Sequence, residues 1–303
     1  MKKLPKGVHT VLYALFDADG EPDRQAMRRQ VEICIDQHGA AGIVTLGLAT
    51  EVRHLTQQQR RRIVEWNAAD IAGRVPLGVT IFEPTPEEQI SAIAHAADHG
   101  ADWAIIQPPV TASDETALAT AFGTVLRQCP IPGAIQNAPQ FIGVGLGVDA
   151  IRRLGDDHDN LVAVKQEVSA VETAALVDAV GERLQVFSGR GGLELIDCMH
   201  AGIEGHVPAP EYADFLIRIW NAMAAGKENE ARAAYARLLP MATFVVQSLD
   251  TLTIYGKLLF CRRNGLSFHP RRGAPAPTPF GFRALTGHAH MLGIDTAGWD
   301  PIG

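Results

Sequence analysis

The sequence of 303 residues lacks the features that mark several large classes of protein. Its four cysteines lie far apart, at Cys34, Cys129, Cys198 and Cys261, and no cysteine or histidine stands at zinc spacing from them. It has no run of about 18 apolar residues, and its N-terminal lysines are not followed by an apolar stretch. These absences argue against a disulfide framework, a zinc finger, a membrane span and a secretory leader. They predict a cytoplasmic protein with reduced thiols.

Concentrated positive charge is also missing. The formal net charge of −7 is spread along the chain, and the basic runs are short, at residues 60–62 and 271–272. A protein without a basic stripe is not expected to bind nucleic acid or an anionic membrane. The sequence also lacks a Gly-x-Gly-x-x-Gly motif after its first apolar run and a phosphate-binding Gly-x4-Gly-Lys-Ser/Thr motif. Both absences argue against a nucleotide cofactor, and we expect no cofactor.

What the sequence does have is a regular alternation of short apolar runs and longer amphipathic stretches. The runs predict eight strands, at residues 8–15, 42–46, 76–81, 102–107, 131–136, 161–165, 184–187 and 203–207. Between them, residues 23–38 and 57–71 have apolar residues at helical spacing. Thr56 and Ser113 stand where helix N-caps are expected, and Gly39, Gly100 and Gly202 end helices just before the next strand.

Eight strands alternating with helices predict an α/β fold, either an open doubly wound sheet or a closed (β/α)8 TIM barrel. The length suits a barrel with an extension. Beyond residue 207 the pattern is helical, at residues 211–225, 228–246, 250–264 and about 280–292, with a Pro/Gly-rich loop at 268–281. We therefore predict a barrel in residues 1–225 and a C-terminal helical region, residues 226–303, packed on it.

Lys165 ends the sixth predicted strand, Leu161-Val162-Ala163-Val164-Lys165. Alternation along a strand places Lys165 on the face opposite the two valines, which suit packing under outer helices. Lys165 would then point into the mouth of the barrel at the carboxyl ends of the strands, where barrel enzymes place their chemistry. Partial removal from water favours a neutral, nucleophilic amine. The alternative is a lysine that simply extends from a strand end to water.

The order of several short motifs resembles the dihydrodipicolinate synthase / N-acetylneuraminate lyase family of class I aldolases almost from end to end. The segments that resemble family motifs are Gly47-Leu48-Ala49-Thr50-Glu51, Pro108-Pro109, Asn137-Ala138-Pro139, Val164-Lys165, Ser188-Gly189, Gly202-Ile203-Glu204-Gly205 and, loosely, Lys257 with Arg271 and Pro275. The resemblance implies a TIM barrel and a Schiff base between Lys165 and a 2-oxo acid such as pyruvate. It also implies a homo-oligomer, a dimer or a tetramer.

Several positions depart from the family pattern. Gln136 stands where the family has a tyrosine that relays protons, and an amide cannot gain or lose a proton near neutral pH. Leu48 and Ala49 replace two hydroxyl residues of the carboxylate-binding loop, although backbone N–H groups there can still bind a carboxylate. Phe141 falls near the position of an arginine that binds the second substrate. The resemblance thus implies a divergent member without the motif tyrosine, and not a true dihydrodipicolinate synthase.

Polar residues elsewhere are candidates to replace the missing relay. His206 on the eighth strand has a side chain suited to acid/base catalysis, or it is a hydrogen-bonded barrel histidine. Glu167 follows Lys165 by two residues, or it belongs to a helix start capped by Ser169. Arg190 either binds a substrate anion or faces solvent. Glu51 is expected to be a buried hydrogen-bond anchor.

The sequence therefore predicts a lyase or aldolase that acts on a 2-oxo acid through Lys165, with an aldehyde as a candidate second substrate. The predicted catalytic residues are Lys165, Gln136 and His206, and the predicted substrate-binding residues are Leu48, Ala49, Thr50, Gly189, Arg190, Val207 and Phe141. An alternative is a catalytically impaired barrel that binds a 2-oxo acid in a sensing or regulatory role. A metal-dependent aldolase is disfavoured, because the predicted strand ends carry no set of metal ligands.

Overall fold

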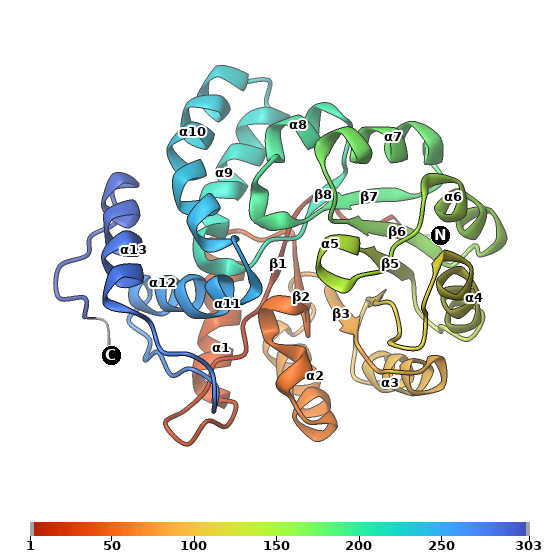
Figure 1. The fold of residues 1–303 in the computed structure, drawn as a ribbon, viewed down its shortest axis with the longest axis horizontal. Helices are drawn as coiled ribbons and strands as arrows, with labels where there is room; N and C mark the ends of the chain where they lie inside the picture. The colour runs from red at the N-terminus through yellow and green to blue at the C-terminus, as the bar shows by residue number, and fades with distance from the viewer. Residues whose placement is uncertain (1–2, 301–303) are drawn as a thin grey trace.

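Eight parallel strands form a closed barrel, which the helices surround (Figure 1). The computed structural model describes residues 3–300. The strands are β1 (Gly7–Val11), β2 (Gly42–Thr45), β3 (Leu77–Ile81), β4 (Trp103–Ile106), β5 (Gly133–Asn137), β6 (Leu161–Gln166), β7 (Gln185–Ser188) and β8 (Gly205–His206). Each pairs with the next along the chain, and β8 pairs with β1. The predicted TIM barrel is confirmed, and the open sheet is excluded.

The helices between the strands form the outer layer. They are α1 (Arg24–Glu32), α2 (Gln57–Ile71), α3 (Pro86–Asp98), α4 (Glu115–Leu126), α5 (Pro139–Ile142), α6 (Val148–Asp157), α7 (Ala170–Val180) and α8 (Leu195–His200). Thr56 caps α2 as predicted, since its side chain accepts from the N–H of Gln59. The N-cap of α4 is Asp114 rather than Ser113. The carboxylate of Asp114 accepts from the N–H of Ala117, a contact that a charged oxygen favours at a helix start.

The C-terminal helices lie beside one another along one side of the barrel (Figure 1). They are α9 (Ala213–Ala224), α10 (Glu228–Val245), α11 (Leu249–Thr251), α12 (Lys257–Arg263) and α13 (Pro279–Met291), with a π-helical turn, Leu252–Gly256, between α11 and α12. C-terminal helices packed on a barrel were predicted, while the exact division at residue 225 stays a prediction. Within residues 3–300 no single helix is long and apolar enough to cross a membrane, although α10 and residues 249–263, bent by 108°, together have the length and composition.

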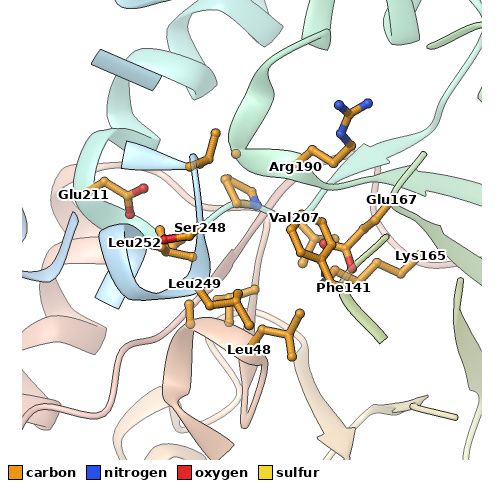
Figure 2. A pocket seen from close by; sticks show the side chains of 16 residues that line it. Leu48, Phe141, Lys165, Glu167, Arg190, Val207, Glu211, Ser248, Leu249 and Leu252 are labelled. Atoms are coloured by element: carbon orange, nitrogen blue, oxygen red, sulfur yellow. Dashed lines mark ion pairs between the residues drawn. The ribbon is translucent and has the colours of Figure 1, made fainter. Parts of the chain in front are cut away.

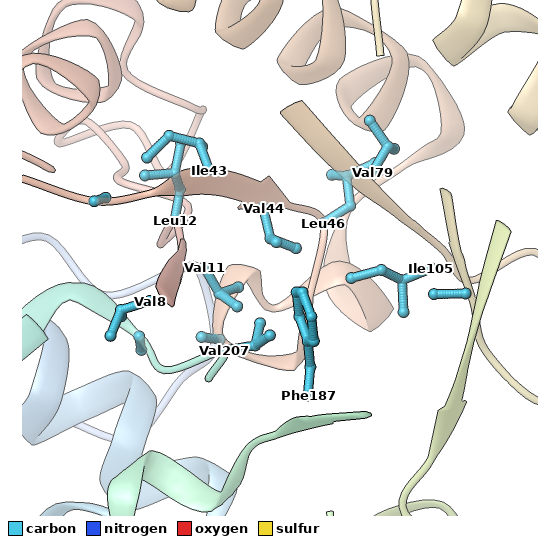
Figure 3. Packing of buried hydrophobic residues seen from close by; sticks show 14 of the residues in the cluster. Val8, Val11, Leu12, Ile43, Val44, Leu46, Val79, Ile105, Phe187 and Val207 are labelled. Carbon is cyan, nitrogen blue, oxygen red and sulfur yellow. The ribbon is translucent and has the colours of Figure 1, made fainter. Parts of the chain in front are cut away.

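The interior of the barrel is filled by large side chains that face glycines on neighbouring strands. Trp103 and Phe187 both point inward, and their rings lie 6.0 Å apart. A Cβ on Gly78 would lie 2.6 Å from the Trp103 ring, and one on Gly205 would lie 2.8 Å from Phe187. Figure 3 shows Phe187 beside Val207 in this packing. Large side chains opposite glycines close the interior, so the space for a ligand lies at the carboxyl ends of the strands.

The first and the last predicted strands differ most from expectation, because each is three residues shorter than predicted. The run at residues 8–15 is paired only up to Val11, and β8 contains two residues. Residues 12–15 are nevertheless buried, and Tyr13 among them packs against Phe260 of α12. The length of an apolar run indicates how much of the chain is buried, and here the buried segment extends beyond the end of the strand.

Candidate active site

Lys165 lies at the inner face of β6 and lines a cavity at the mouth of the barrel (Figure 2). Its neighbours in register are Gln136 of β5 and Phe187 of β7, so all three side chains point inward. The cavity measures about 580 Å³ including its open mouth. The side chain of Lys165 is 6% exposed, so the amine is largely removed from water yet reaches the cavity.

Glu167 is the immediate partner of Lys165, with its Oε1 3.3 Å from the lysine Nζ. Its second oxygen, Oε2, accepts a hydrogen bond from Gln136 Nε2 at 2.5 Å. Gln136 Oε1 in turn accepts from Gln107 Nε2 at 2.9 Å. The buried chain Gln107–Gln136–Glu167–Lys165 holds one carboxylate against the amine. Gln136 therefore orients Glu167. Glu167 contacts the amine of Lys165 and has a carboxylate that can transfer a proton.

Gly189 makes room for Glu167. A Cβ at this position would lie 2.6 Å from both Cγ and Oε1 of Glu167, which is closer than real Cβ contacts come. The substrate-binding role of Gly189 stays a prediction. What the structure gives is a steric reason for glycine here, because any side chain would displace the carboxylate beside Lys165.

Five of the other predicted residues line the same cavity, namely Leu48, Ala49, Phe141, Arg190 and Val207. Arg190 has a left-handed backbone, with φ 58°, and its Nη1 lies 2.5 Å from Glu194 Oε2. Thr50 is not at the cavity. It is fully buried, and its hydroxyl donates to the carbonyl of Leu12 at 2.6 Å. Thr50 therefore fixes the loop that carries Leu48 and Ala49.

His206 faces away from the cavity. Alternation along β8 turns Gly205 and Val207 inward, so His206 points toward the outer layer, where its Nδ1 pairs with Ser188 Oγ at 2.8 Å. Burial lowers the pKa of His206 to about 3. A histidine that stays neutral near pH 7 and does not reach the cavity is a packed barrel residue. His206 does not line the cavity that Lys165 lines, so the geometry gives no support to its predicted catalytic role, which stays a prediction.

Sequence reasoning did not find the opposite wall of the cavity. That wall comes from the C-terminal part of the chain, through Val246, Ser248, Leu249 and Leu252, with Glu211 at its edge (Figure 2). Val246 and Ser248 lie between α10 and α11, Leu249 begins α11, and Leu252 begins the π-helical turn. None of these residues matches a motif. Their place at the cavity depends on how the C-terminal helices pack over the barrel, which no local pattern encodes.

Glu211 is a fully buried carboxyl group paired with Tyr13. The Tyr13 hydroxyl donates to Glu211 Oε2 at 2.7 Å, and Oε1 has no hydrogen-bond partner in the described part of the chain. Burial raises the pKa of Glu211 from 4.5 to about 7, and the hydrogen bond from Tyr13 offsets part of that rise. Ionisation of this group is therefore costly in the folded protein.

The Glu211→Gln variant is expected to be more stable than the wild type at pH 8.5 and nearly equal to it at pH 4. The folded pKa is raised, so the carboxyl costs little while both states are mostly protonated, and its penalty grows as the pH rises from 4.5 to about 7. The full penalty corresponds to about 3 kcal/mol. Urea unfolding at both pH values measures it, with exposed Glu230→Gln as the control. A stability gain of equal size at both pH values would contradict this assignment.

Glu51 joins the barrel to the C-terminal region as the buried anchor that the sequence predicted. Lys257 Nζ donates to its Oε1, and Arg271 Nε lies 3.0 Å from its Oε2. Burial lowers the pKa of Lys257, with the Glu51 carboxylate opposing that shift. Lys257 does not line the cavity, and its amine is occupied by Glu51. Geometry therefore selects Lys165, and not Lys257, as the lysine that a substrate can reach.

The family model for the dihydrodipicolinate synthetase family matches residues 4–262. The chain belongs to this family. Among its relatives, the 4-hydroxy-tetrahydrodipicolinate synthase of Methanothrix thermoacetophila is 28% identical over 277 residues, which cover 90% of this chain and 91% of the relative. A probable 2-dehydro-3-deoxy-D-pentonate aldolase, YjhH of Escherichia coli (strain K12), is 26% identical over 230 residues, covering 73% and 75%. Family members are thus named both as synthases and as aldolases.

The structure of this chain also matches solved structures of the family. The structure of YagE, a prophage protein of the dihydrodipicolinic acid synthase family from Escherichia coli K12 in complex with pyruvate, superposes with a TM-score of 0.87 at 19% identity. The superposition covers 96% of this chain and 99% of YagE. The family assignment and the fold support a lyase or aldolase, and they leave the substrate of this chain to be argued from its own cavity.

Proposed function

We propose that this protein is a class I lyase in which Lys165 forms a Schiff base with a 2-oxo acid. The neutral Nζ attacks the keto carbon as the C=O π bond breaks, and one Nζ proton passes to the keto oxygen to give a carbinolamine. The carbinolamine oxygen then takes up a second proton, from solvent, and leaves as water, which gives the protonated imine. The imine then accepts the electron pair that is released when the carbon next to the imine carbon loses one of its other bonds. The observation that carries this proposal is a buried amine at the cavity with one carboxylate 3.3 Å away.

Glu167 supplies the proton transfers in this proposal. It accepts the proton that Nζ loses on attack and passes it to the keto oxygen, and it then relays the solvent proton with which the carbinolamine oxygen leaves as water. The Glu167 carboxylate lies 3.3 Å from the amine, close to the reach of about 2.6–3.2 Å that general acid/base catalysis uses, and such contacts commonly tighten when substrate binds. Gln136 has no proton to transfer and acts as the positioning residue for Glu167 Oε2. Glu167 thereby compensates for the amide at the position where the family resemblance implies a tyrosine.

The walls of the cavity indicate the class of second substrate. Leu48, Phe141, Val207, Leu249 and Leu252 give it an apolar lining, and the guanidinium of Arg190 is held by Glu194. Such a cavity favours an aldehyde with an apolar group over one with a carboxylate. We therefore infer that the protein is not a dihydrodipicolinate synthase. Turnover of pyruvate with aspartate semialdehyde near the typical enzyme rate of about 10 per second would contradict this inference.

Borohydride reduction in the presence of pyruvate tests the imine directly. We expect one reduced adduct per chain, on the peptide that contains Lys165, and none in the Lys165→Ala variant. The buried Lys257 and the exposed Lys227 are internal controls on the same chain, and both should remain unmodified. An adduct on another lysine, or no adduct with any of a panel of 2-oxo acids, would refute the mechanism. An adduct without turnover would favour the alternative of a 2-oxo acid sensor.

A further inference from the structure

Three potential metal ligands meet on the outer surface between α2 and α3. Glu65 lies on α2, His95 in the last turn of α3, and His99 at the C-cap of α3. Each offers one ligand atom, and these atoms all lie within 4.8 Å of one another. Glu65 Oε1 is 3.6 Å from His95 Nε2 and 3.9 Å from His99 Nε2. None of the three residues lines the cavity around Lys165.

Both imidazoles present an Nε2 atom without a hydrogen-bond partner beside Glu65, within the part of the chain that the structure describes. His99 Nδ1 is 2.8 Å from the carbonyl oxygen of His95, a contact that places a proton on Nδ1 and leaves Nε2 free as a ligand. Metal-bound histidines usually make such a second hydrogen bond to a backbone carbonyl or a carboxylate. His95 Nε2 is buried and has no hydrogen-bond partner within residues 3–300. It points to the place where Glu65 Oε1 lies just beyond hydrogen-bond distance.

The spacing suits a small divalent ion. Ligand atoms that bind tetrahedral Zn²⁺ at about 2.0–2.1 Å lie about 3.3 Å from one another. Glu65 Oε1 is within a few tenths of an ångström of that spacing from both histidines, and the two imidazoles, whose ligand atoms lie within 4.8 Å of one another, have to close by at most about 1.5 Å. Two imidazoles and a carboxylate favour a transition ion over Mg²⁺ or Ca²⁺, which prefer oxygen ligands alone. The carbonyl end of α3 also favours positive charge near His99.

We propose that Glu65, His95 and His99 form a site for a divalent transition-metal ion that joins α2 to α3. Zn²⁺ is the ion used to test it. Water completes the coordination, because the side chains of Glu65 and His99 are 45% and 40% exposed. The metal would hold two neighbouring helices of the outer layer together and would take no part in the chemistry at Lys165. The sequence signal for it is the pair of histidines four residues apart, which places both on one face of a helix.

Titration calorimetry of the chelator-treated full chain with Zn²⁺ at pH 7.5 tests this site. We expect one saturable site per chain, weakened at least tenfold in His99→Ala and in Glu65→Gln, and retained in the control His200→Ala. His200 is a matched control because it is an exposed surface histidine 3.2 Å from the carboxylate of Glu228. Absence of saturable binding by the wild type, or equal binding by His99→Ala, would overturn the proposal.

Thermal unfolding and Co²⁺ absorption provide readouts that do not depend on activity. Zn²⁺ should raise the melting temperature of the wild type and not that of the double variant His95→Ala/His99→Ala. Co²⁺ should give visible absorption bands with the wild type and not with this double variant. His99 is exposed, so His99→Ala is expected to fold even if loss of the partly buried His95 destabilises α3. Identical Zn²⁺ shifts in the wild type and His99→Ala would again overturn the site.

Discussion

Replacing Glu167 with glutamine is expected to lower turnover by about 10²–10⁴-fold, the usual contribution of a positioned acid/base group. The substituted amide would keep the size of the side chain and its reach toward Lys165, but it cannot carry a proton. The amine would still reach the substrate, so borohydride should still trap the adduct on Lys165, more slowly. Single-turnover kinetics with trapping separates the two effects. Unchanged turnover would show that another group moves the proton.

The Gly189→Ala variant tests the same assignment without altering any polar group. The added methyl would meet Glu167 Cγ and Oε1 at 2.6 Å and push the carboxylate away from Lys165. We expect a loss of turnover in the same direction as for Glu167→Gln, with a folded protein by circular dichroism. Gly287→Ala is the matched control, because a Cβ there meets no atom within 4 Å. Normal activity of Gly189→Ala would mean that the position of Glu167 does not matter.

The Glu51→Gln variant is expected to lose about 3–5 kcal/mol of unfolding free energy, the usual cost of removing one partner from a buried ion pair. It would leave the amine of Lys257, which is 1% exposed, without its counter-charge. Arg271 would lose its partner as well, so the loop that carries it should loosen. Urea unfolding measures the loss, and limited proteolysis should detect increased cleavage near residues 265–278.

The double variant Glu51→Gln/Lys257→Met should be more stable than Glu51→Gln alone, because the fully buried unpaired amine is then removed and only the partly exposed Arg271 is left without its partner. The exposed pair Lys227 and Glu230 at the start of α10, with its charged atoms 3.7 Å apart, offers a matched control. Removing Glu230 should change stability by less than about 1 kcal/mol. A double variant less stable than either single variant would contradict the view that Glu51 serves mainly to neutralise Lys257.

The sequence predicted the barrel because strand and helix periods are local signals, and it predicted the inward direction of Lys165 from alternation along β6. For β8 the same alternation did not decide which of the two faces of the strand turns into the barrel. His206 and Glu204 share one face, and which face turns inward depends on Phe187 filling the interior beside Gly205. The family resemblance directed attention to Leu48, Ala49 and Phe141, and all three line the cavity.

The contacts that sequence reasoning missed are those made by long-range packing. Tyr13 meets Glu211 across 198 positions, and Lys257 meets Glu51 across 206. Neither pair has a spacing that a pattern can detect. Glu167 was visible as a candidate, but its alternative as part of a helix start was equally consistent with the sequence. The hydrogen bond from Gln136 and the space above Gly189 decide in favour of the cavity.

The cavity has the amine of Lys165 on the barrel and much of its far wall on Leu249 and Leu252, between α10 and α12. Nothing in that turn supports Lys165 or Glu167 directly. Residues 246–252 can therefore be varied as a short cassette, by nature or in a directed-evolution library, while the reactive centre is kept intact. If the proposed function holds, related barrels would then diverge in the second substrate that they accept through this one short stretch, which lies outside the motifs that identify the family.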